Sequence, residues 1–223
     1  AVIVQDLGAA HLLQETLPQL PLHASTQMAV HNTPGVKLLE EQGFERVVLA
    51  RETSLESIKK IKANTNVELE VFVHGALCVA YSGQCLLSSM IGGRSGNRGL
   101  CAQPCRMQYQ LLDETGKEYK DEAGKYLLST RDLNMLEHLP ELLAAGVSSL
   151  KIEGRMKRPE YVATVVHHYR QAIDSYYNHQ RFDRKLARQE LLQIFNRDFT
   201  TGYYFNNPGA ELMSHSRPDN RGV

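Results

Sequence analysis

Segments with the hydrophobic periodicity of β-strands alternate along the chain with segments that have the periodicity of α-helices. Short runs in which every second residue is aliphatic predict strands at residues 2–5, 22–25, 46–50, 68–74 and 149–153. Segments with apolar residues every three or four positions predict helices at residues 9–16, 34–42, 55–63, 134–145, from Pro159 onward, and 184–195. This alternation of strands and helices is typical of repeated βα units around a parallel sheet.

The faces of the predicted strands favour a barrel over an open sheet. In residues 68–74, Leu69 points to one face while Glu70 and His74 point to the other. Strands of a fully covered open sheet are apolar on both faces, whereas a barrel interior accepts polar groups near its mouth. We therefore expect a TIM-like (β/α) barrel over residues 1–195. A complete barrel needs about 250 residues, so this one is expected to be incomplete at its N-terminus.

Two segments interrupt this rhythm. Residues 75–109 form a glycine-rich loop, and residues 106–130 alternate around a turn at 114–116, which predicts an inserted β-hairpin. Residues 196–223 contain turn residues without a period. They are expected to be a tail that leads into a C-terminal domain the chain lacks.

The composition limits the function classes. The chain is 42% apolar and 22% charged, and 25 Lys and Arg balance 25 Asp and Glu. No overall field favours nucleic acid or membrane, so such a partner would need a local patch. There is no charged and apolar leader and no apolar run near the roughly 20 residues that span a bilayer, so we expect a cytoplasmic protein without a membrane partner. An incomplete barrel would expose apolar edges, which favours self-association.

All four cysteines lie in the glycine-rich loop, at Cys78, Cys85, Cys101 and Cys105. Four are too few for a disulfide scaffold, and clustered cysteines in a reducing compartment more often bind metal or do redox chemistry. Only the second pair has the spacing of a zinc knuckle, while iron–sulfur ligands tolerate wider spacings. A site of four thiolates is therefore predicted, with iron–sulfur, zinc and unligated buried thiols all left open by the spacing.

Charged residues accompany this loop. Arg94, Arg98 and Arg106 would offset the thiolate charge or bind an anionic substrate such as an RNA phosphate. From residue 91 to residue 109 the loop contains no acidic residue, so a local basic surface is possible on a neutral protein. The alternative is that these arginines only balance the thiolates or pair with acidic neighbours.

Five further residues are candidates for catalysis. Glu70 and Lys151 lie on the polar face of their strands, and because each needs a partner when buried, we expect them to meet. A structural ion pair is the alternative to a catalytic role. His74, Glu153 and Arg155 end their strands, where a barrel places its active site.

One segment carries a family resemblance. The run EVFVHGALCVAYSGQCLLS, residues 70–88, resembles the signature of peptidase family U32, the collagenase-like proteases. The segments HASTQMAVHN, GGRSGNRGLCAQPCR, SLKIEGRMKRPEYVATVV and FNRDFTTGYY are similar to other segments of that family. The resemblance implies a TIM-like barrel followed by a smaller domain, with roughly the first three βα units missing here.

The resemblance implies two activities. The family name implies proteolysis, in some relatives of collagen. Other members resemble proteins that hydroxylate a transfer-RNA wobble uridine or a ribosomal-RNA cytidine, or that act in anaerobic ubiquinone hydroxylation. Several of these hold a 4Fe–4S cluster through cysteines at positions like those of this chain.

The residues favour RNA hydroxylation with an iron–sulfur site. The chain has no H-E-x-x-H and no G-x-S-x-G motif, and no nucleophile stands beside an obvious base. A cluster accounts for all four cysteines. The alternatives are a peptidase that acts on collagen-like or extended polypeptides, and a zinc-stabilised binding module.

Overall fold

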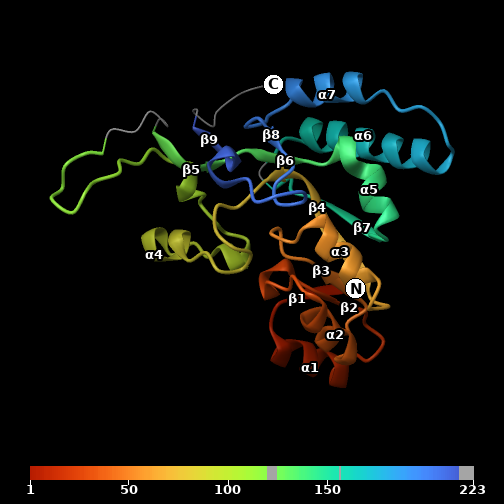
Figure 1. Cartoon of the computed structure of the whole chain (residues 1–223). Helices are drawn as coiled ribbons and strands as arrows, with labels where there is room; N and C mark the ends of the chain where they lie inside the picture. Colours follow the sequence, from red (N-terminus) through yellow and green to blue (C-terminus); the bar gives the residue numbers. More distant parts are fainter. Residues whose placement is uncertain (120–124, 156, 216–223) are drawn as a thin grey trace.

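The computed structural model describes residues 1–119, 125–155 and 157–215, which form a mixed α/β fold (Figure 1). The large sheet consists of β1 (Val2–Val4), β2 (Leu22–Ala24), β3 (Arg46–Val48), β4 (Glu68–Ala76), β6 (Asp132–Asn134), β7 (Ser149–Ile152) and β8 (Phe199–Thr200). The small sheet pairs β5 (Tyr126–Thr130) with β9 (Met213–His215). The α-helices are α1 (Leu7–Thr16), α2 (Thr33–Glu41), α3 (Leu55–Lys62), α4 (Leu87–Gly92), α5 (Leu139–Ala144), α6 (Pro159–Tyr177) and α7 (Arg184–Gln193).

The first half of the chain is a regular series of βα units. Strands β1 to β4 are parallel and lie side by side in chain order, with one α-helix in each connection. The helices α1, α2 and α3 begin where the side chains of Asp6, Asn32 and Ser54 accept hydrogen bonds from the first-turn backbone N–H groups. The predicted strands and helices of this half are confirmed, with ends that differ by no more than two residues.

Strand β4 is the centre of the large sheet. It pairs in parallel with β3 and β7, and its last residues pair antiparallel with β6, which in turn pairs with β8. Gly75 has φ +100°, and a Cβ there would lie 2.3 Å from the Glu153 carbonyl oxygen, so only glycine fits this crowded strand end. The ends of β4 and β7 are thereby brought together where the glycine-rich loop begins.

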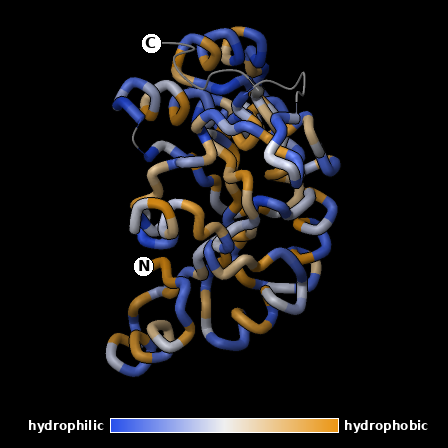
Figure 2. The backbone as a smooth tube through the Cα atoms, turned by 90° about the vertical axis from the view of Figure 1, so that its left-hand side faces the viewer, coloured by the Kyte–Doolittle hydropathy of each residue, from blue (hydrophilic) through white to orange (hydrophobic). Residues whose placement is uncertain are grey.

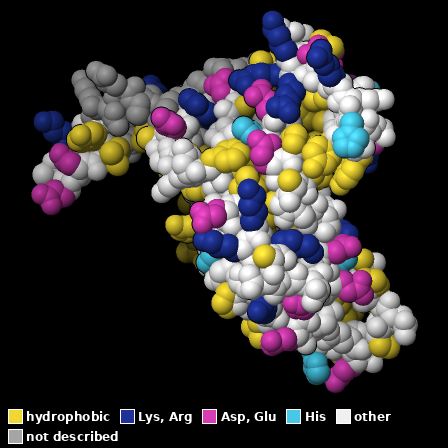
Figure 3. Space-filling view, turned by 45° about the vertical axis from the view of Figure 1, so that its right-hand side comes forward, with side chains coloured by type: hydrophobic (Ala, Val, Ile, Leu, Met, Phe, Trp, Pro, Cys, Tyr) yellow, Lys and Arg dark blue, Asp and Glu magenta, His cyan; other side chains and the backbone are white. Residues whose placement is uncertain are grey.

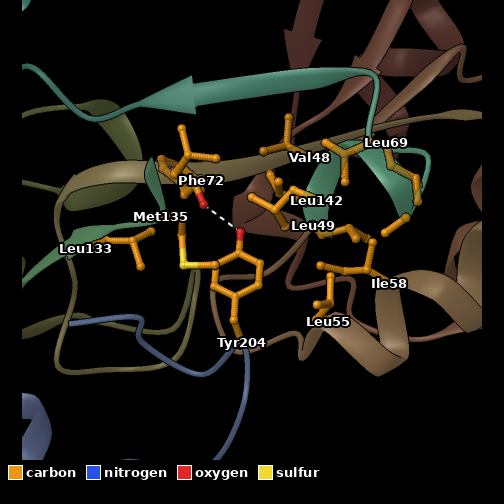
Figure 4. Close-up of a cluster of buried hydrophobic side chains, with 14 of the residues drawn as sticks. Val48, Leu49, Leu55, Ile58, Leu69, Phe72, Leu133, Met135, Leu142 and Tyr204 are labelled. Atoms are coloured by element: carbon orange, nitrogen blue, oxygen red, sulfur yellow. Dashed lines mark hydrogen bonds between the residues drawn. The ribbon is translucent and has the colours of Figure 1, made fainter. Parts of the chain in front are cut away.

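The core lies on both sides of β4. Leu69 and Val73 are fully buried, and in Figure 4 the helix residues Leu55 and Ile58 lie below Leu69. The Tyr204 hydroxyl donates a 2.6 Å hydrogen bond to the Phe72 carbonyl (Figure 4). Figure 2 shows the hydrophobic stretches along the strands in the middle of the molecule, with hydrophilic turns around them.

The predicted helix at 134–145 begins later than expected. Residues 132–134 form β6, a 3-10 turn spans Leu136–His138, and α5 covers only Leu139–Ala144. The helical pattern overlapped a segment whose backbone pairs with β4 in the folded chain, so tertiary pairing overrode local preference. The prediction of one continuous helix from 134 is therefore wrong.

The described residues beyond 195 pack against the preceding part of the chain, and the domain division expected at residue 195 stays a prediction. Beyond it, β8 joins the large sheet and β9 pairs with β5, while Tyr204 and Leu212 are buried. These segments therefore add strands and buried residues to those of the preceding chain. Residues 216–223, the end of the expected tail, lie outside the described residues.

The expected insertion forms a hairpin tip. Leu112 and Glu118 form an antiparallel bridge around a turn in which Asp113 caps the backbone N–H groups of Thr115 and Lys117. Figure 1 shows this segment extending away from the sheets. At the base of the insertion, the Tyr109 N–H donates to the Lys125 carbonyl, and β5 pairs with β9. Residues 120–124 of the expected hairpin lie outside the described residues.

The structure confirms a mixed α/β fold with a parallel-stranded sheet flanked by helices. Closure of this sheet into a TIM-like barrel stays a prediction. In the described part of the chain, no helix combines the length and apolar character needed to cross a membrane.

Candidate functional site

The four cysteines lie on one loop at the end of β4. This loop, residues 77–106 and called the thiol loop below, contains α4 and two 3-10 turns, Gly96–Arg98 and Pro104–Arg106. All four cysteines are free and half-buried. The thiols are thus partly shielded from bulk water but are not fully buried in the core.

The electrostatics of the thiols show that they share one neighbourhood. Burial raises the pKa of the Cys105 thiol, the Arg106 guanidinium opposes this, and the negative charges of the other three thiolates add to it. Burial also raises the pKa of Cys78, opposed by the backbone N–H of Ala80 and the charge of Arg51. The two cysteines are therefore protonated at neutral pH, and a bound metal would displace their protons.

The four free thiols are the donor set that the sequence predicts for a metal centre, and metal or cluster binding by them stays a prediction. Within the described ranges, no group of three or more His, Cys, Asp or Glu side chains is close enough to hold a single metal ion. The backbone N–H of Gln103 also points to the Cys101 sulfur at 3.3 Å, as amides do around iron–sulfur clusters.

The thiol loop is fixed against the connections after β2 and β3. Gly83 has φ +75°, and a Cβ there would lie 2.2 Å from the Gln27 carbonyl oxygen. The Gln27 side chain in turn donates to the Gly96 carbonyl. Ser82 is buried, and its backbone N–H donates a 3.0 Å hydrogen bond to Glu52. The loop therefore rests on ends of strands that precede it in the sheet.

Arg106 is not available for a phosphate. Its guanidinium is buried and donates 2.6 Å hydrogen bonds to the carbonyls of Thr130 and Leu77, and a longer one to Ser129. Its remaining role toward the site is its positive charge beside Cys105. The expectation that it binds an anionic substrate is therefore corrected, because its donors are used within the protein.

Arg94 and Arg98 are exposed on the thiol loop, as a phosphate contact requires. The Arg94 Nε donates to the Leu100 carbonyl, which leaves its terminal nitrogens directed outward. Arg155 is exposed as well, and its Nη2 donates to the Cys101 carbonyl at 3.2 Å. These three arginines border the loop that carries the thiols.

Glu70 and Lys151 meet as predicted, with 3.0 Å between the Lys151 Nζ and a Glu70 carboxylate oxygen. The carboxylate also accepts hydrogen bonds from Ser149 and Arg46. Burial alone would raise the pKa of Glu70, but the hydrogen bonds from Lys151 and Ser149 outweigh it and the pKa is lowered. Glu70 is fully engaged near the start of β4, away from the thiol loop, which is the arrangement of a structural ion pair.

His74 is buried among aromatic rings. The rings of Tyr161, Tyr169 and Phe199 lie 5.6 to 6.1 Å from its ring. Burial lowers the pKa of His74 to about 3, so the imidazole is neutral at physiological pH. Its Nδ1 is buried without a hydrogen-bond partner among the described residues.

Glu153 follows β7 and is half-exposed. Its carboxylate accepts a hydrogen bond from the backbone N–H of Arg155, which shapes the turn after the strand. Glu153 and Arg155 therefore lie at the same end of the large sheet as His74, as the sequence predicted for strand ends.

Sequence reasoning missed Asp132, Tyr161 and Arg197 at this end of the sheet, where Lys157 lies beside them. Asp132 and Arg197 form a buried ion pair at 3.1 Å, and the Lys157 Nζ lies 3.2 Å over the Phe195 ring and 5.5 Å from the Tyr161 ring. Burial, then the charge of Arg197, lowers the pKa of Lys157 to about 8. The available signal was a charged Arg197 between two phenylalanines, which suggests a buried guanidinium in need of a partner.

Charges elsewhere are mixed. Figure 3 shows basic and acidic side chains interspersed over the face in view, with hydrophobic side chains between them. An anionic partner would therefore be recognised by a local group of residues rather than by the whole surface.

The sequence matches the model of peptidase family U32 over residues 1–214. This chain belongs to peptidase family U32. Its U32 relatives include the tRNA hydroxylation protein P1 of Bacillus subtilis, with 40% identity over 94% of this chain. The 23S rRNA 5-hydroxycytidine C2501 synthase of Escherichia coli is 46% identical over 78% of this chain. The collagenase of Porphyromonas gingivalis is 35% identical over 92% of this chain.

The U32 chain is shorter than these relatives. The matched region spans 51% of the Bacillus protein, 26% of the Escherichia protein and 52% of the Porphyromonas protein. This chain thus spans about half the length of the curated relatives it matches, or less. The names of these relatives divide between RNA hydroxylation and proteolysis.

Proposed function

We propose that this chain takes part in the hydroxylation of a transfer-RNA or ribosomal-RNA base, with a 4Fe–4S cluster held by Cys78, Cys85, Cys101 and Cys105. The observation that carries the proposal is the gathering of all four thiols of the chain on one braced loop at the strand ends. A bound cluster would supply one-electron transfer. The surrounding residues hold the thiols, offset their charge and limit their contact with water.

The charge around the thiols supports a cluster that carries net negative charge. Arg106 and Arg51 act on the thiols from within the protein. Arg155 binds the loop backbone at Cys101. A zinc-stabilised binding module is the alternative for the same four thiols, and it would hold one zinc ion in a closed tetrahedral site.

The exposed arginines support contact with RNA. Arg94, Arg98 and Arg155 present guanidinium groups beside the thiol loop, where they would bind phosphates next to a target base. The names of two relatives, from Bacillus and Escherichia, state hydroxylation of transfer RNA and ribosomal RNA. Since the chain spans half of the first of them or less, substrate and activity are proposed here for this chain.

The peptidase alternative has less support at residue level. Ser88 is buried, and its Oγ accepts a hydrogen bond from the Ala102 backbone N–H, so it braces the thiol loop. His74 is neutral and enclosed by rings, and a general base must reach its nucleophile. A collagenase among the relatives keeps this alternative open to test. Protease activity that survives Ser88→Ala, Ser89→Ala and His74→Ala would remove these residues as its basis.

The cluster is tested by anaerobic purification. We expect a brown protein with broad visible absorption, and with iron and acid-labile sulfide both present in proportion to protein. Replacing each cysteine by serine should reduce iron and sulfide together, because each thiolate holds one corner. A colourless protein with stoichiometric zinc would contradict the cluster.

The activity is tested separately on RNA. Cells that lack their own U32 hydroxylation proteins and express this chain should contain hydroxylated uridine or cytidine, detected by mass spectrometry of digested RNA. The Cys78→Ser variant should not restore the modified nucleoside. Unmodified RNA in cells that hold the iron-loaded chain would contradict hydroxylation by this chain.

A further inference from the structure

A group of buried polar side chains lies near Arg106, the last residue of the thiol loop. It consists of His74 at the end of β4, Asp132 at the start of β6, Tyr161 on α6 and Arg197 before β8, and is called the buried polar cluster. Each side chain is more than nine-tenths buried. Each also has one buried polar atom without a hydrogen-bond partner among the described residues: His74 Nδ1, Asp132 Oδ2, Tyr161 Oη and Arg197 Nε.

These side chains surround one place. Asp132 and Arg197 are joined by their 3.1 Å ion pair. The rings of His74 and Tyr161 lie 6.1 Å apart. Burial raises the pKa of Tyr161, and the nearby charge of Asp132 raises it further while that of Arg197 lowers it, so the phenol lies within reach of both charges. Tyr161 therefore links the ion pair to the imidazole.

Unpartnered buried polar atoms are costly, so four of them in one cluster call for water or a ligand that completes their hydrogen bonds. The free Asp132 oxygen would repel an anion, and the free Arg197 N–H would repel a cation. The Tyr161 hydroxyl and the neutral His74 imidazole can each donate or accept. The four unpartnered atoms therefore suit a molecule that carries both donors and acceptors, in surroundings to which Lys157 and Arg106 add positive charge.

Aromatic rings border this polar set. Phe199 and Tyr169 lie 5.7 and 5.6 Å from the His74 ring, and Phe195 lies 4.8 Å from the Arg197 guanidinium. Flat heterocycles stack on such rings while their edges are read by hydrogen bonds. A pyrimidine carries alternating carbonyl acceptors and N–H donors on one edge.

We propose that the buried polar cluster binds the pyrimidine ring of the base to be modified, after that base leaves its RNA stack. The inference rests on the proposed function and names the site that recognises the base. Asp132 accepts a hydrogen bond from a ring or amino N–H, Arg197 donates to a ring carbonyl, and Tyr161 adds a third contact. The base then lies near Arg106, at the end of the thiol loop.

The test uses two tyrosines of the same helix. Tyr161→Phe removes a hydroxyl that has no partner in the described protein, so the free protein should melt at the same or a higher temperature. Tyr169→Phe removes a hydroxyl that bonds the Val73 carbonyl and the Met135 N–H, so it should melt lower. Binding of uridine and cytidine to the purified full chain is measured by NMR titration.

Wild type and Tyr169→Phe should bind one of the two nucleosides, and Tyr161→Phe should bind it about tenfold more weakly, the equivalent of one lost hydrogen bond. Equal binding by Tyr161→Phe, or no nucleoside binding by wild type, would overturn the inference. Binding of inorganic phosphate or acetate in place of nucleoside would also overturn it, in favour of an anion site.

This experiment separates the inference from the proposed function. Nucleoside binding requires neither iron nor turnover. If wild type binds nucleoside through Tyr161 but no hydroxylated RNA forms in cells, the proposed function fails and the binding site stands. If RNA is hydroxylated and Tyr161→Phe changes neither nucleoside binding nor the modification, the inference fails alone.

Discussion

His74 stays neutral because aromatic rings replace the water that would solvate its charge. Tyr169 and Phe199 contact it edge-on or tilted, and burial brings its pKa to about 3. An imidazole of this kind keeps the same protonation state over the whole physiological pH range. It can therefore serve as a fixed hydrogen-bonding group but not as a proton shuttle at neutral pH.

This state of His74 gives the protein an acid-sensitive stability. Below about pH 6.5 the unfolded chain takes up a proton that the folded chain does not bind until about pH 3. The free energy of unfolding should therefore fall with decreasing pH, by up to about 1.4 kcal/mol per pH unit in this window. Denaturant titrations should show a steeper fall of stability with decreasing pH in wild type than in His74→Phe.

The ion pair of Glu70 and Lys151 is expected to act on stability alone. Glu70→Gln should lower the free energy of unfolding by about 2 to 3 kcal/mol, because Lys151 then faces no charge and Arg46 keeps only Glu68 as its charged partner. Since the folded-state pKa of Glu70 is lowered, its contribution is present above about pH 4.3 and is lost as the pH falls further. The cost of Glu70→Gln should thus shrink in acid.

If Glu70 has only a structural role, the iron content and RNA modification of Glu70→Gln should match those of wild type at temperatures where both are folded. Loss of modification in a folded, iron-loaded variant would assign Glu70 to the chemistry.

The sequence could place Glu70 opposite Lys151 because both positions follow from strand alternation. It could not place Asp132 beside Arg197, since 65 residues separate them and neither lies in a periodic segment. In the sequence, Tyr161 resembles any other residue of an amphipathic helix. Pairings that arise only when distant segments meet leave no local pattern.

At the scale of elements, the thiol loop depends on a few close contacts with its neighbours. Gly83 meets the Gln27 carbonyl, where a side chain has no room and φ is positive. Gly92, in the same loop, has nothing within 4 Å of a Cβ position. The two glycines therefore form a matched pair for testing how the loop is held.

Gly83→Ala should displace the loop and lower the iron content to roughly half or less, while Gly92→Ala should leave it near the wild-type value. Iron and sulfide assays after anaerobic purification measure this difference. Equal iron in both variants would mean that the contact with Gln27 does not position the thiols.

The segment after residue 195 is expected to contribute to stability. Tyr204→Phe removes the buried hydrogen bond to the Phe72 carbonyl and should lower the free energy of unfolding by about 1 to 2 kcal/mol. Chemical denaturation measures this change. An unchanged midpoint would indicate that this segment detaches from β4 before the protein unfolds.

Element prediction succeeded where local pattern and tertiary contact agree, as in β1 to β4 and their helices. It failed at β6, β8 and β9, which have two or three residues and are strands only because a partner backbone lies beside them. A stretch as short as Phe199–Thr200 carries too few positions to show a period.

At the scale of the whole molecule, zero formal charge means that RNA binding must depend on few residues. Arg94→Ala and Arg98→Ala should each weaken RNA binding and reduce the slope of log affinity against log salt by about 1. Lys60→Ala is the control, because Lys60 is exposed on α3 and pairs with Glu56. Fluorescence anisotropy at several salt concentrations measures these slopes, and salt-independent binding would contradict phosphate contacts.

Arg106 fastens the first residue of the thiol loop, through the Leu77 carbonyl, to the strand that follows the loop, through Thr130. The loop is therefore closed by the polypeptide itself, not by whatever the thiols bind. If the thiols hold the proposed cluster, the chain would fold first and the cluster would be inserted afterwards. A chain that lost such a cluster to oxidants would keep its fold and could bind a new one.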